Sequence, residues 1–539
     1  MTHIYLYGPP GSGKSTVGKL LAERLALPFV DIDSVIESQA GKKIAQIFEQ
    51  DGEGQFRNLE STALRTVASE STAVIALGGG ALLHPENRQC AEESGTVLCF
   101  TADFETLQAR VNRAPGQRPL IKHEGAPGQV ESPLKKLLEK RKAHYQSFPL
   151  NLPISEIPAE RTADNAQMVL GRYRVSGMGS PYNVYVGDGL TDKTGELFVE
   201  AGLGCKCVIV GDSNTVPLYG QRVAAALGKN GVGCKLVTIP AGESHKTIAT
   251  VVTLWKAFME AGIERGDTVI ALGGGVTGDL TGFAAATWLR GVRWVSMPTT
   301  LLAMCDSGLG GKTGADLPEG KNLIGAFHPP ALVIADTGSL TTLPVREIRC
   351  GLAESIKHAV IADPELLSFL PQFAFCKTEA DKVICGHLQG APWLTQFVAR
   401  SMAVKIRVIC EDPFERGVRA SLNLGHTIGH GIEVATNFEL LHGEAVAIGT
   451  VIEGEIAVEL GLAQATLPQT LAALFESVGL PVAMPAGIDS DAVLRAIMHD
   501  KKRADGIVRF ALPVSIGKVQ TKIEVQDQVL RKKITCKKW

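Results

Sequence analysis

The stretch His3-Ile-Tyr-Leu-Tyr7-Gly8-Pro-Pro-Gly-Ser-Gly13-Lys14-Ser15 opens the chain and decides the fold of its first part. An apolar segment runs into the pattern Gly-x-x-x-x-Gly-Lys-Ser, and a helical pattern follows over residues 16–25. A strand, a glycine-rich turn and a helix in this order hold phosphate through backbone N–H groups and the helix N-terminus. Lys14 supplies a charge at the β- and γ-phosphates, and the Ser15 hydroxyl reaches Mg²⁺. The sequence therefore predicts a site for ATP with Mg²⁺, formed by Gly11, Ser12, Gly13, Lys14, Ser15 and Thr16.

Composition describes a globular protein of several domains with small-molecule substrates. The chain has 539 residues, 45% of them hydrophobic, and a formal net charge of −2. This length predicts two to four domains. The net charge does not indicate a partner such as nucleic acid or an acidic membrane. The eleven cysteines are scattered without a Cys-x-x-Cys pair, which is typical of reduced thiols. Because there is neither room for a signal peptide nor an apolar run of about 20 residues, we expect a cytoplasmic protein and no membrane partner.

Alternating apolar and amphipathic segments predict an α/β fold. Strands are expected at 3–7, 73–77 and 96–100, and then at 206–211, 234–239, 268–272, 293–297 and 332–335. Two turn-rich clusters between residues 150 and 181 place a boundary near 172. We expect three parts: a P-loop kinase domain with a parallel sheet and flanking helices at 1–172, an α/β nucleotide-binding subdomain at 173–338, and a mostly helical metal-binding subdomain at 339–539.

Charged residues after the phosphate loop suggest what accepts the phosphoryl group. The next expected strand ends Phe29-Val-Asp31-Ile-Asp33, and strand alternation puts both aspartates on one face. A Phe-Arg-x-x-Glu motif at residues 56–60, three glycines at 78–80, Arg118 and Arg141 follow. Each alone could be an ordinary surface or turn residue.

Together these motifs resemble shikimate kinase over residues 1–170. The resemblance implies that shikimate is held by Asp33, Arg57, Gly79, Gly80 and Arg141. It also implies that Asp31 acts near Mg²⁺ and that Arg118 belongs to a lid that closes over ATP. Arginine forks suit a carboxylate substrate, and an aspartate suits its hydroxyls. A gluconate-type kinase, the rival interpretation, would share the phosphate loop but not this set.

Three of the twelve histidines fall within seventeen residues, at positions 426, 430 and 442. Glu354, His426 and His442 could supply three ligands to a divalent metal and leave one position open, as catalytic zinc sites do. His426 and His430 are four residues apart, so they share one helix face. A lone histidine is more often a core residue, but the glycine-flanked pair and the carboxylate favour a functional site.

A second glycine-rich turn follows the strand expected at 268–272. Residues 273–278 satisfy Gly-x-Gly-x-x-Gly, but no acidic residue follows about twenty positions later, as the usual dinucleotide-binding fold expects. We interpret this turn as a phosphate-approach loop in a non-standard nucleotide domain.

Residues 176–539 resemble 3-dehydroquinate synthase nearly end to end. Matching blocks include Gly-Val-Thr-Gly-Asp279, Asp306-Ser-Gly-Leu-Gly-Gly-Lys312, Gly-Leu-Ala-Glu354-x-x-Lys357 and Asn423-x-Gly-His426. The resemblance implies conversion of 3-deoxy-D-arabino-heptulosonate 7-phosphate to 3-dehydroquinate, with NAD and Zn²⁺ or Co²⁺. It also suggests a homodimer formed through this part of the chain.

The same resemblance assigns roles to individual residues. The metal ligands would be Glu354, His426 and His442, and His430 would be an acid/base near the departing phosphate. Phosphate and carboxylate would be bound by Arg290, Lys312, Lys357, Lys405, Arg419 and Asn423. Of these, Lys312, Lys357 and Asn423 would also be catalytic. In the first site, the catalytic residues would be Lys14, Asp33 and Arg118. NAD would be bound by Asp212, Glu243, Lys246, Gly275, Val276, Gly278, Asp279, Thr299, Thr300, Lys312, Lys321, Asn322 and Thr342.

Two alternatives remain open at this stage. The second part could be another sugar-phosphate cyclase or a metal-dependent polyol dehydrogenase, and only the dehydrogenase would consume NAD stoichiometrically. Alternatively, one half could be a degenerate binding module, although Lys14, Ser15, Asp33 and the metal set are all intact. The preferred hypothesis is a bifunctional enzyme of aromatic amino acid (chorismate) biosynthesis, with two independent active sites.

Overall fold

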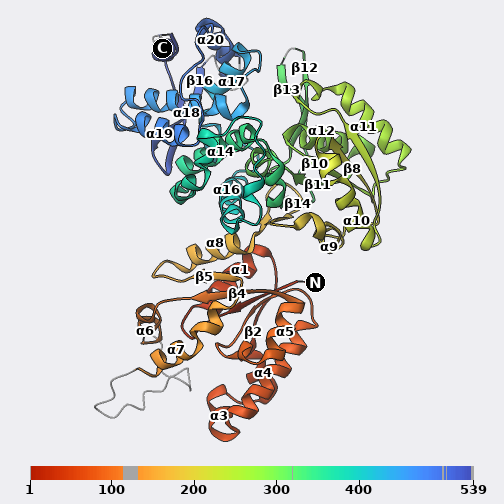
Figure 1. Ribbon diagram of the computed structural model, residues 1–539, viewed down its shortest axis with the longest axis vertical. Coiled ribbons are helices and arrows are strands. Elements are labelled where there is room, and N and C mark those ends of the chain that lie inside the picture. The colour runs from red at the N-terminus through yellow and green to blue at the C-terminus, as the bar shows by residue number, and fades with distance from the viewer. Residues whose placement is uncertain (1, 113–131, 319, 500–502, 505–506, 536–539) are drawn as a thin grey trace. The chain divides into compact units, whose positions relative to one another are not determined.

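A computed structural model describes residues 2–112, 132–318, 320–499, 503–504 and 507–535. The chain forms two compact units, residues 1–174 and 175–539, each considered separately below (Figure 1). Arg118 and most of the expected lid lie outside the described residues. No helix in the described ranges is both long enough and apolar enough to cross a membrane.

The first unit is built on a five-stranded parallel sheet in the order β2–β3–β1–β4–β5. Its strands are β1 (His3–Tyr7), β2 (Phe29–Asp31), β3 (Val74–Ala76), β4 (Gly95–Thr101) and β5 (Leu150–Pro153). Its helices are α1 (Lys14–Leu25), α2 (Ile32–Ala40), α3 (Ile44–Gln50), α4 (Gly52–Ala68), α5 (Pro85–Ser94), α6 (Phe104–Asn112), α7 (Pro133–Gln146) and α8 (Ala159–Leu170). The predicted parallel α/β fold is confirmed.

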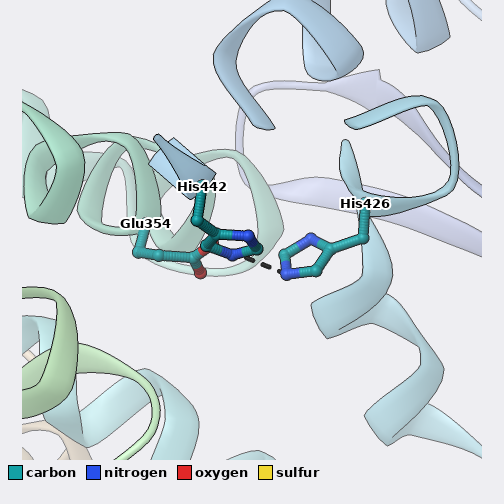
Figure 2. A group of neighbouring side chains, drawn as sticks. All are labelled: Glu354, His426 and His442. Carbon is teal, nitrogen blue, oxygen red and sulfur yellow. Dashed lines mark ion pairs between the residues drawn. The ribbon is translucent and has the colours of Figure 1, made fainter. Parts of the chain in front are cut away.

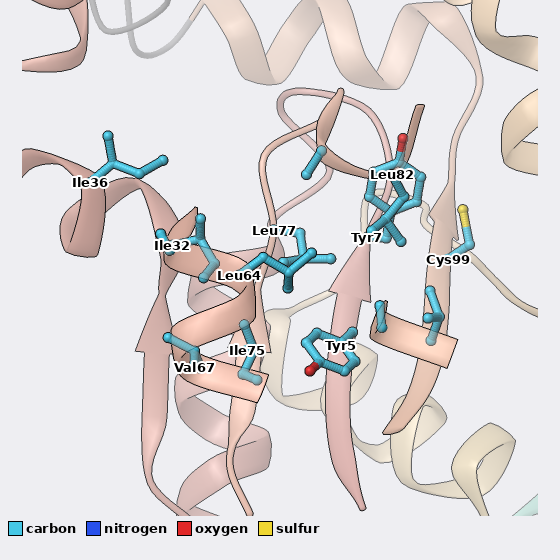
Figure 3. Packing of buried hydrophobic residues seen from close by; sticks show 14 of the residues in the cluster. Tyr5, Tyr7, Ile32, Ile36, Leu64, Val67, Ile75, Leu77, Leu82 and Cys99 are labelled. Carbon is cyan, nitrogen blue, oxygen red and sulfur yellow. The ribbon is translucent and has the colours of Figure 1, made fainter. Parts of the chain in front are cut away.

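The central strand β1 is buried on both faces, because helices cover both sides of the sheet. Ile4 and Leu6 pack with residues of α1 and α8 on one face. Tyr5 and Tyr7 point to the other face, into a cluster with Leu64 of α4 (Figure 3). This two-sided burial explains why β1 reads as a continuous apolar run, and it fixes the position of the phosphate loop that follows.

One local prediction is wrong. Strand β2 ends at Asp31, and Ile32 already begins α2, so Asp33 does not alternate with Asp31 on a strand. The Asp31 carboxylate caps α2 by accepting a hydrogen bond from the Asp33 N–H at 3.1 Å. Aspartate favours such a cap over continuing a strand, because its side chain satisfies a backbone donor at the start of the helix.

The second sheet has seven strands in the order β6–β7–β14–β11–β10–β8–β9, and its edge strand β6 spans the boundary between residues 174 and 175. Its strands are β6 (Arg172–Val175), β7 (Tyr182–Gly187), β8 (Lys206–Asp212), β9 (Gly233–Ile239), β10 (Thr268–Gly273), β11 (Arg293–Pro298) and β14 (Leu332–Asp336), and those from β7 to β9 pair in parallel. Its helices are α9 (Thr194–Glu200), α10 (Gln221–Lys229), α11 (Ile248–Glu260), α12 (Gly275–Thr287) and α13 (Leu301–Cys305). An antiparallel hairpin joins β12 (Lys312–Leu317) to β13 (Gly320–Phe327).

Helices dominate the rest of the chain, in line with the fold class expected. They are α14 (Val345–Ile361), α15 (Phe375–Thr378), α16 (Pro392–Glu411), α17 (His426–Ala435), α18 (His442–Glu459), α19 (Leu467–Ser477), α20 (Ser490–His499) and α21 (Asp527–Thr535). The sequence analysis did not foresee a small antiparallel sheet of β15 (Arg503–Ala504), β16 (Ile507–Ser515) and β17 (Lys518–Glu524). Alternate residues Val508, Phe510 and Leu512 of β16 are buried in the same core as Ile448 and Ile452 of α18.

Candidate active sites

The phosphate loop of the first unit has the backbone that a bound phosphate requires. Gly8, Gly11 and Gly13 have positive φ angles of 131°, 86° and 87°, a region that favours glycine. A Cβ on Gly8 would lie 2.4 Å from the Phe100 carbonyl oxygen, so no other residue fits there. Lys14 Nζ donates to the Gly8 and Pro9 carbonyls at 2.8 and 3.0 Å and thus lies over the loop.

The two predicted oxygen ligands for Mg²⁺, Ser15 and Asp31, meet at the start of α1. The Ser15 hydroxyl donates to Asp31 Oδ2 at 2.6 Å, joining the helix to the end of β2. A hydroxyl and a carboxylate are ligands that Mg²⁺ accepts when it also binds nucleotide phosphates. The chemistry of this pair therefore fits the predicted Mg²⁺–ATP site.

The predicted shikimate residues surround the glycine run at 78–80. Arg57 pairs with Glu60 at 2.6 Å and with Glu53 at 3.0 Å, which holds its guanidinium in place. A Cβ on Gly80 would lie 3.0 Å from Arg57 Nη2. Burial raises the pKa of Glu60 in spite of the neighbouring Arg57. The Arg57 guanidinium therefore faces the glycine run across a gap that any side chain at position 80 would fill.

Two further residues reach the same run. Arg141 Nη1 and the Tyr145 hydroxyl donate to the Gly79 carbonyl at 2.9 and 2.7 Å. A Cβ on Gly78 would lie 3.5 Å from Asp33 Oδ1, which puts Asp33 at the opposite end of the run from Arg57. All five predicted shikimate residues thus gather here, although Asp33 arrives from a helix rather than from a strand.

Arg110 of α6 was not predicted. Its Nη1 donates to the Ser12 carbonyl of the phosphate loop at 3.4 Å, and its Nη2 donates to the Ser155 carbonyl at 2.7 Å. Nothing in the amphipathic pattern of α6 distinguishes it from a surface arginine. Only the fold brings this cation to the nucleotide loop.

The three predicted metal ligands come together from three helices of the second unit (Figure 2). Glu354 lies within α14, whereas His426 and His442 are the first residues of α17 and α18. Glu354 Oε1 is 3.6 Å from His426 Nε2 and 3.5 Å from His442 Nε2. Gly425 makes the turn into α17 at a φ of 78°. A Cβ there would lie 2.3 Å from Thr450 Oγ1, so the approach of α18 needs this glycine.

Two observations indicate that this group fits a divalent metal. Neither Glu354 oxygen, both buried, has a hydrogen-bond donor at normal geometry among the described residues. His426 Nδ1 contacts the Leu424 carbonyl at 3.1 Å, which leaves Nε2 to face Glu354. Such an outer hydrogen bond fixes the tautomer of metal-binding histidines. Two imidazoles and one carboxylate suit Zn²⁺ or Co²⁺.

Buried ion pairs surround these ligands. Lys357 pairs with Glu354, and Lys405 pairs with Asp306. Burial opposes ionisation of Glu354, but Lys357 and His442 lower its pKa below the usual value. Burial by itself would lower the pKa of His442, but Glu354 and Glu433 raise it to about 10. Without a metal, the cluster is thus a compact network of opposite charges.

The expected phosphate and carboxylate clamp forms only in part. Lys357 Nζ donates to the Leu422 carbonyl at 2.9 Å, next to Asn423. Lys312 and Asn423 converge on Glu415, at 2.5 and 2.8 Å, and sequence reasoning missed both Glu415 and Asp306. The buried Arg419 donates to the Pro413 carbonyl.

Arg290 is the exception in this set. It is exposed after α12 in a left-handed conformation (φ 68°). Within the described part of the chain, it makes none of the contacts that link the other members of the set.

His430 lies one turn along α17 from His426. Their ring centroids are 5.3 Å apart, and the His430 side chain is 44% exposed, so it faces solvent beside the metal group. Glu433, another residue that sequence reasoning missed, is buried between His430 and His442. Burial alone would raise the pKa of Glu433, but His442, His430 and Lys321 lower it to about 2.

The predicted NAD residues follow the carboxyl ends of five parallel strands, where open α/β sheets bind ligands. Asp212 ends β8, Glu243 and Lys246 follow β9, and Gly275, Val276 and Gly278 open α12 after β10. Thr299 and Thr300 follow β11, and Thr342 ends the turn after β14. Asp212 Oδ2 accepts from the Thr277 hydroxyl at 3.3 Å, and the Thr299 N–H donates to the Gly273 carbonyl at 3.0 Å.

Charged members of the NAD set pair with each other. Lys246 Nζ lies 2.6 Å from Asp279 Oδ2 and donates to Asn322 Oδ1 at 2.7 Å. Lys321 Nζ lies 3.1 Å from Glu243 Oε1. Burial raises the pKa of Asp279 to about 6, although Lys246 opposes it. Thr342 is set apart from this group and contacts the Tyr219 hydroxyl at 2.6 Å.

Comparison with known protein families matches three segments of the chain. The shikimate kinase family matches residues 10–164. The N-terminal and C-terminal parts of the 3-dehydroquinate synthase family match residues 236–350 and 351–503.

Individual relatives agree with these matches. A 3-dehydroquinate synthase from Symbiobacterium thermophilum is 42% identical over 353 residues, which are 65% of this chain and 96% of that protein. One from Nostoc punctiforme is 44% identical over 352 residues, 65% of this chain and 95% of that protein.

Two solved structures resemble the second unit. A 2-epi-5-epi-valiolone synthase from Streptomyces hygroscopicus with NAD⁺ and Zn²⁺ bound has 30% identity and a TM-score of 0.60, covering 68% of this chain and 99% of that one. A 2-deoxy-scyllo-inosose synthase complexed with carbaglucose-6-phosphate, NAD⁺ and Co²⁺ has 26% identity and a TM-score of 0.60, covering 67% and 99%. Both resemblances drawn from the sequence are confirmed. The chain belongs to the 3-dehydroquinate synthase family and carries, ahead of that enzyme, a shikimate kinase domain.

Proposed function

We propose that the chain catalyses two steps of the shikimate pathway. The first unit transfers the γ-phosphoryl group of ATP to the 3-hydroxyl of shikimate. The second converts 3-deoxy-D-arabino-heptulosonate 7-phosphate to 3-dehydroquinate and phosphate. The observation that carries this proposal is that each unit holds its own nearly complete set of site residues, around the glycine run at 78–80 and around Glu354.

In the kinase, Mg²⁺–ATP supplies the phosphoryl group, and the protein supplies position and charge. Lys14 would lie at the β- and γ-phosphates, and Ser15 with Asp31 would hold the metal. Asp33 orients the accepting hydroxyl and takes its proton, while Arg57 and Arg141 hold the shikimate carboxylate.

In the synthase, Glu354, His426 and His442 would hold a Zn²⁺ or Co²⁺ ion, which would supply Lewis-acid activation of the hydroxyl being oxidised, and bound NAD would supply reversible hydride transfer. The buried cations Lys357 and Lys405 bind the anionic ends of the substrate. His430, exposed beside the metal group, exchanges protons near the departing phosphate, whose own oxygen can also accept one.

Sequence identity supports a 3-dehydroquinate synthase over another cyclase. The curated relatives with that activity are 42–44% identical, whereas the two solved cyclases with other products are 26–30% identical. The test is incubation with the heptulosonate phosphate and catalytic NAD. We expect 3-dehydroquinate and one phosphate per turnover without net NADH. Stoichiometric NADH would instead identify a dehydrogenase.

We also propose that the two sites work independently, because the two reactions are not consecutive in the pathway and each unit has its own core. Helix α8 ends at Leu170 and β6 belongs to the synthase sheet, so the pieces to express are 1–171 and 172–539. Each piece should keep its kcat and KM. Loss of either activity on separation would contradict independence.

We further propose a cytoplasmic homodimer formed through the synthase unit, as the family resemblance implies. The ten cysteines of the described part are all free thiols, which supports a reducing compartment. Light scattering of the full chain and of residues 1–171 tests the assembly, since only the full chain should dimerise.

A further inference from the structure

Glu433 is a buried carboxylate next to the metal group that no role assigned so far includes. It lies on α17, three residues beyond His430, with only 4% of its surface exposed. Its Oε2 is 3.6 Å from His442 Nδ1 and 4.0 Å from His430 Nε2. Its Oε1 is 3.8 Å from Lys321 Nζ, which reaches it from the β12–β13 hairpin.

The His442 ring lies between two carboxylates. Its Nε2 is 3.5 Å from Glu354 Oε1, and its Nδ1 is 3.6 Å from Glu433 Oε2. His426 has the matching arrangement, with Nε2 toward Glu354 and Nδ1 3.1 Å from the Leu424 carbonyl. Both histidines thus present Nε2 to the same carboxylate and have an oxygen acceptor behind Nδ1.

An acceptor behind the outer nitrogen has a known physical effect on metal-binding histidines. It holds the proton on that nitrogen, fixes the ring orientation and increases the basicity of the nitrogen that binds the metal. A carboxylate does this more strongly than a carbonyl, because hydrogen bonds to ionised acceptors are stronger.

We propose that Glu433 is a positioning residue for His442: its carboxylate accepts a hydrogen bond from Nδ1–H and directs Nε2 toward Glu354 and the metal. This inference rests on the proposed ligand set of Glu354, His426 and His442. Lys321 contributes by holding the other oxygen of Glu433, so a residue of the nucleotide-binding part helps to orient a metal ligand.

A competing assignment makes Glu433 itself a ligand, because His430, Glu433 and His442 also lie close enough to hold an ion. The geometry favours the Glu354 group. The His426 and His442 ring centroids are 5.0 Å apart, against 6.0 Å for His430 and His442. Both groups share His442, but only the Glu354 group includes His426, so the loss of metal expected in His426→Ala separates the two assignments.

The test compares Co²⁺ and Zn²⁺ affinity, by chelator competition on the metal-stripped full-length chain, for wild type, Glu433→Leu and Glu433→Gln. Glu433→Leu keeps the volume and removes the acceptor, and we expect binding weakened about 10- to 100-fold. Glu433→Gln should lose less, because its amide oxygen can still accept a hydrogen bond from His442 Nδ1–H. The control is Glu459→Gln on α18, which breaks carboxylate pairs with Lys532 and Lys533 away from the site.

The melting temperature of the metal-free protein distinguishes positioning from simple packing. Removing one partner of a buried charge network is destabilising, so Glu433→Leu should lower this melting temperature, whereas the isosteric Glu433→Gln should change it less and still alter the visible spectrum of bound Co²⁺. Unchanged metal affinity in both Glu433 variants would overturn the inference and leave the ligand set intact. Two ions per wild-type chain, with one lost in Glu433→Leu, would also overturn it. A wild-type chain that binds no metal would overturn the ligand set as well.

Discussion

Lys357 lies one turn beyond Glu354 on α14, and the two side chains form an ion pair that is almost wholly inaccessible to solvent. The lysine therefore compensates the carboxylate charge when no metal is present. A bound divalent ion would compensate the same charge from the other side.

This relationship predicts that Lys357→Met destabilises the metal-free protein more than the metal-bound one. Removing one partner of a buried pair typically costs about 3–5 kcal/mol, because the remaining charge is uncompensated. Urea unfolding with and without Zn²⁺ measures the difference. An equal loss in both states would show that Glu354 does not share its charge with a metal.

His426→Ala should remove metal binding and synthase activity together while kinase activity stays normal. Losing one of three ligands should weaken metal binding by more than about 100-fold, beyond the effect of losing an outer contact. Metal content and both activities are measured on the same preparation, with the exposed His387→Ala as control. Full metal occupancy in the variant would refute the ligand assignment.

Lys14→Ala should abolish kinase activity and spare the synthase. In the proposed mechanism the lysine supplies the charge at the transferring phosphoryl group, so we expect kcat to fall by at least about 100-fold. The control is Lys19→Ala, which removes an exposed cation from the same helix. If the variant kept its kinase activity, the first site would be placed wrongly.

Gly80→Ala should raise the KM for shikimate without changing that for ATP. The added methyl group would lie 3.0–3.2 Å from the Arg57 guanidinium and would displace it from the shikimate carboxylate that we propose it binds. We expect about a tenfold increase, which corresponds to about 1.4 kcal/mol. Gly54→Ala is the matched control, since its methyl group meets nothing within 4 Å. An equal rise in the KM for shikimate in both variants would contradict the role assigned to the contact between Gly80 and Arg57.

His358 should make the synthase unit less stable as the pH is lowered from about 6.5 to about 4. Burial lowers its pKa from 6.5 to about 4, and its Nδ1 contacts the Ser401 hydroxyl at 2.9 Å. Above pH 6.5 its contribution is complete; below that the unfolded chain binds a proton that the folded chain refuses, so stability is lost until about pH 4. At pH 5 this loss is about 2 kcal/mol.

Between pH 7 and pH 5, the melting temperature should therefore change less with pH for His358→Asn than for wild type. The exposed His387→Asn should keep the wild-type slope. Parallel slopes in all three proteins would show that His358 is not the group that titrates.

Sequence reasoning worked best where local chemistry demands particular residues. The phosphate loop needs glycine at positions 8, 11 and 13 because its backbone has positive φ, and the metal group needs histidine and glutamate. It failed at Asp33, where a local cap ended the strand early. It also missed β16, whose apolar alternation is explained only by packing on α18.

The residues that it missed share one property. Arg110, Glu415 and Glu433 carry no local motif, and each acquires its place only through contacts with residues far along the chain or on a neighbouring helix. The sequence by itself determined which chemical groups the chain owns and where most central strands of the two parallel sheets run, because those depend on local backbone and side-chain chemistry. Only the tertiary structure decided which nitrogen of His442 faces Glu354 and which faces Glu433, because long-range packing of α14, α17 and α18 sets those distances.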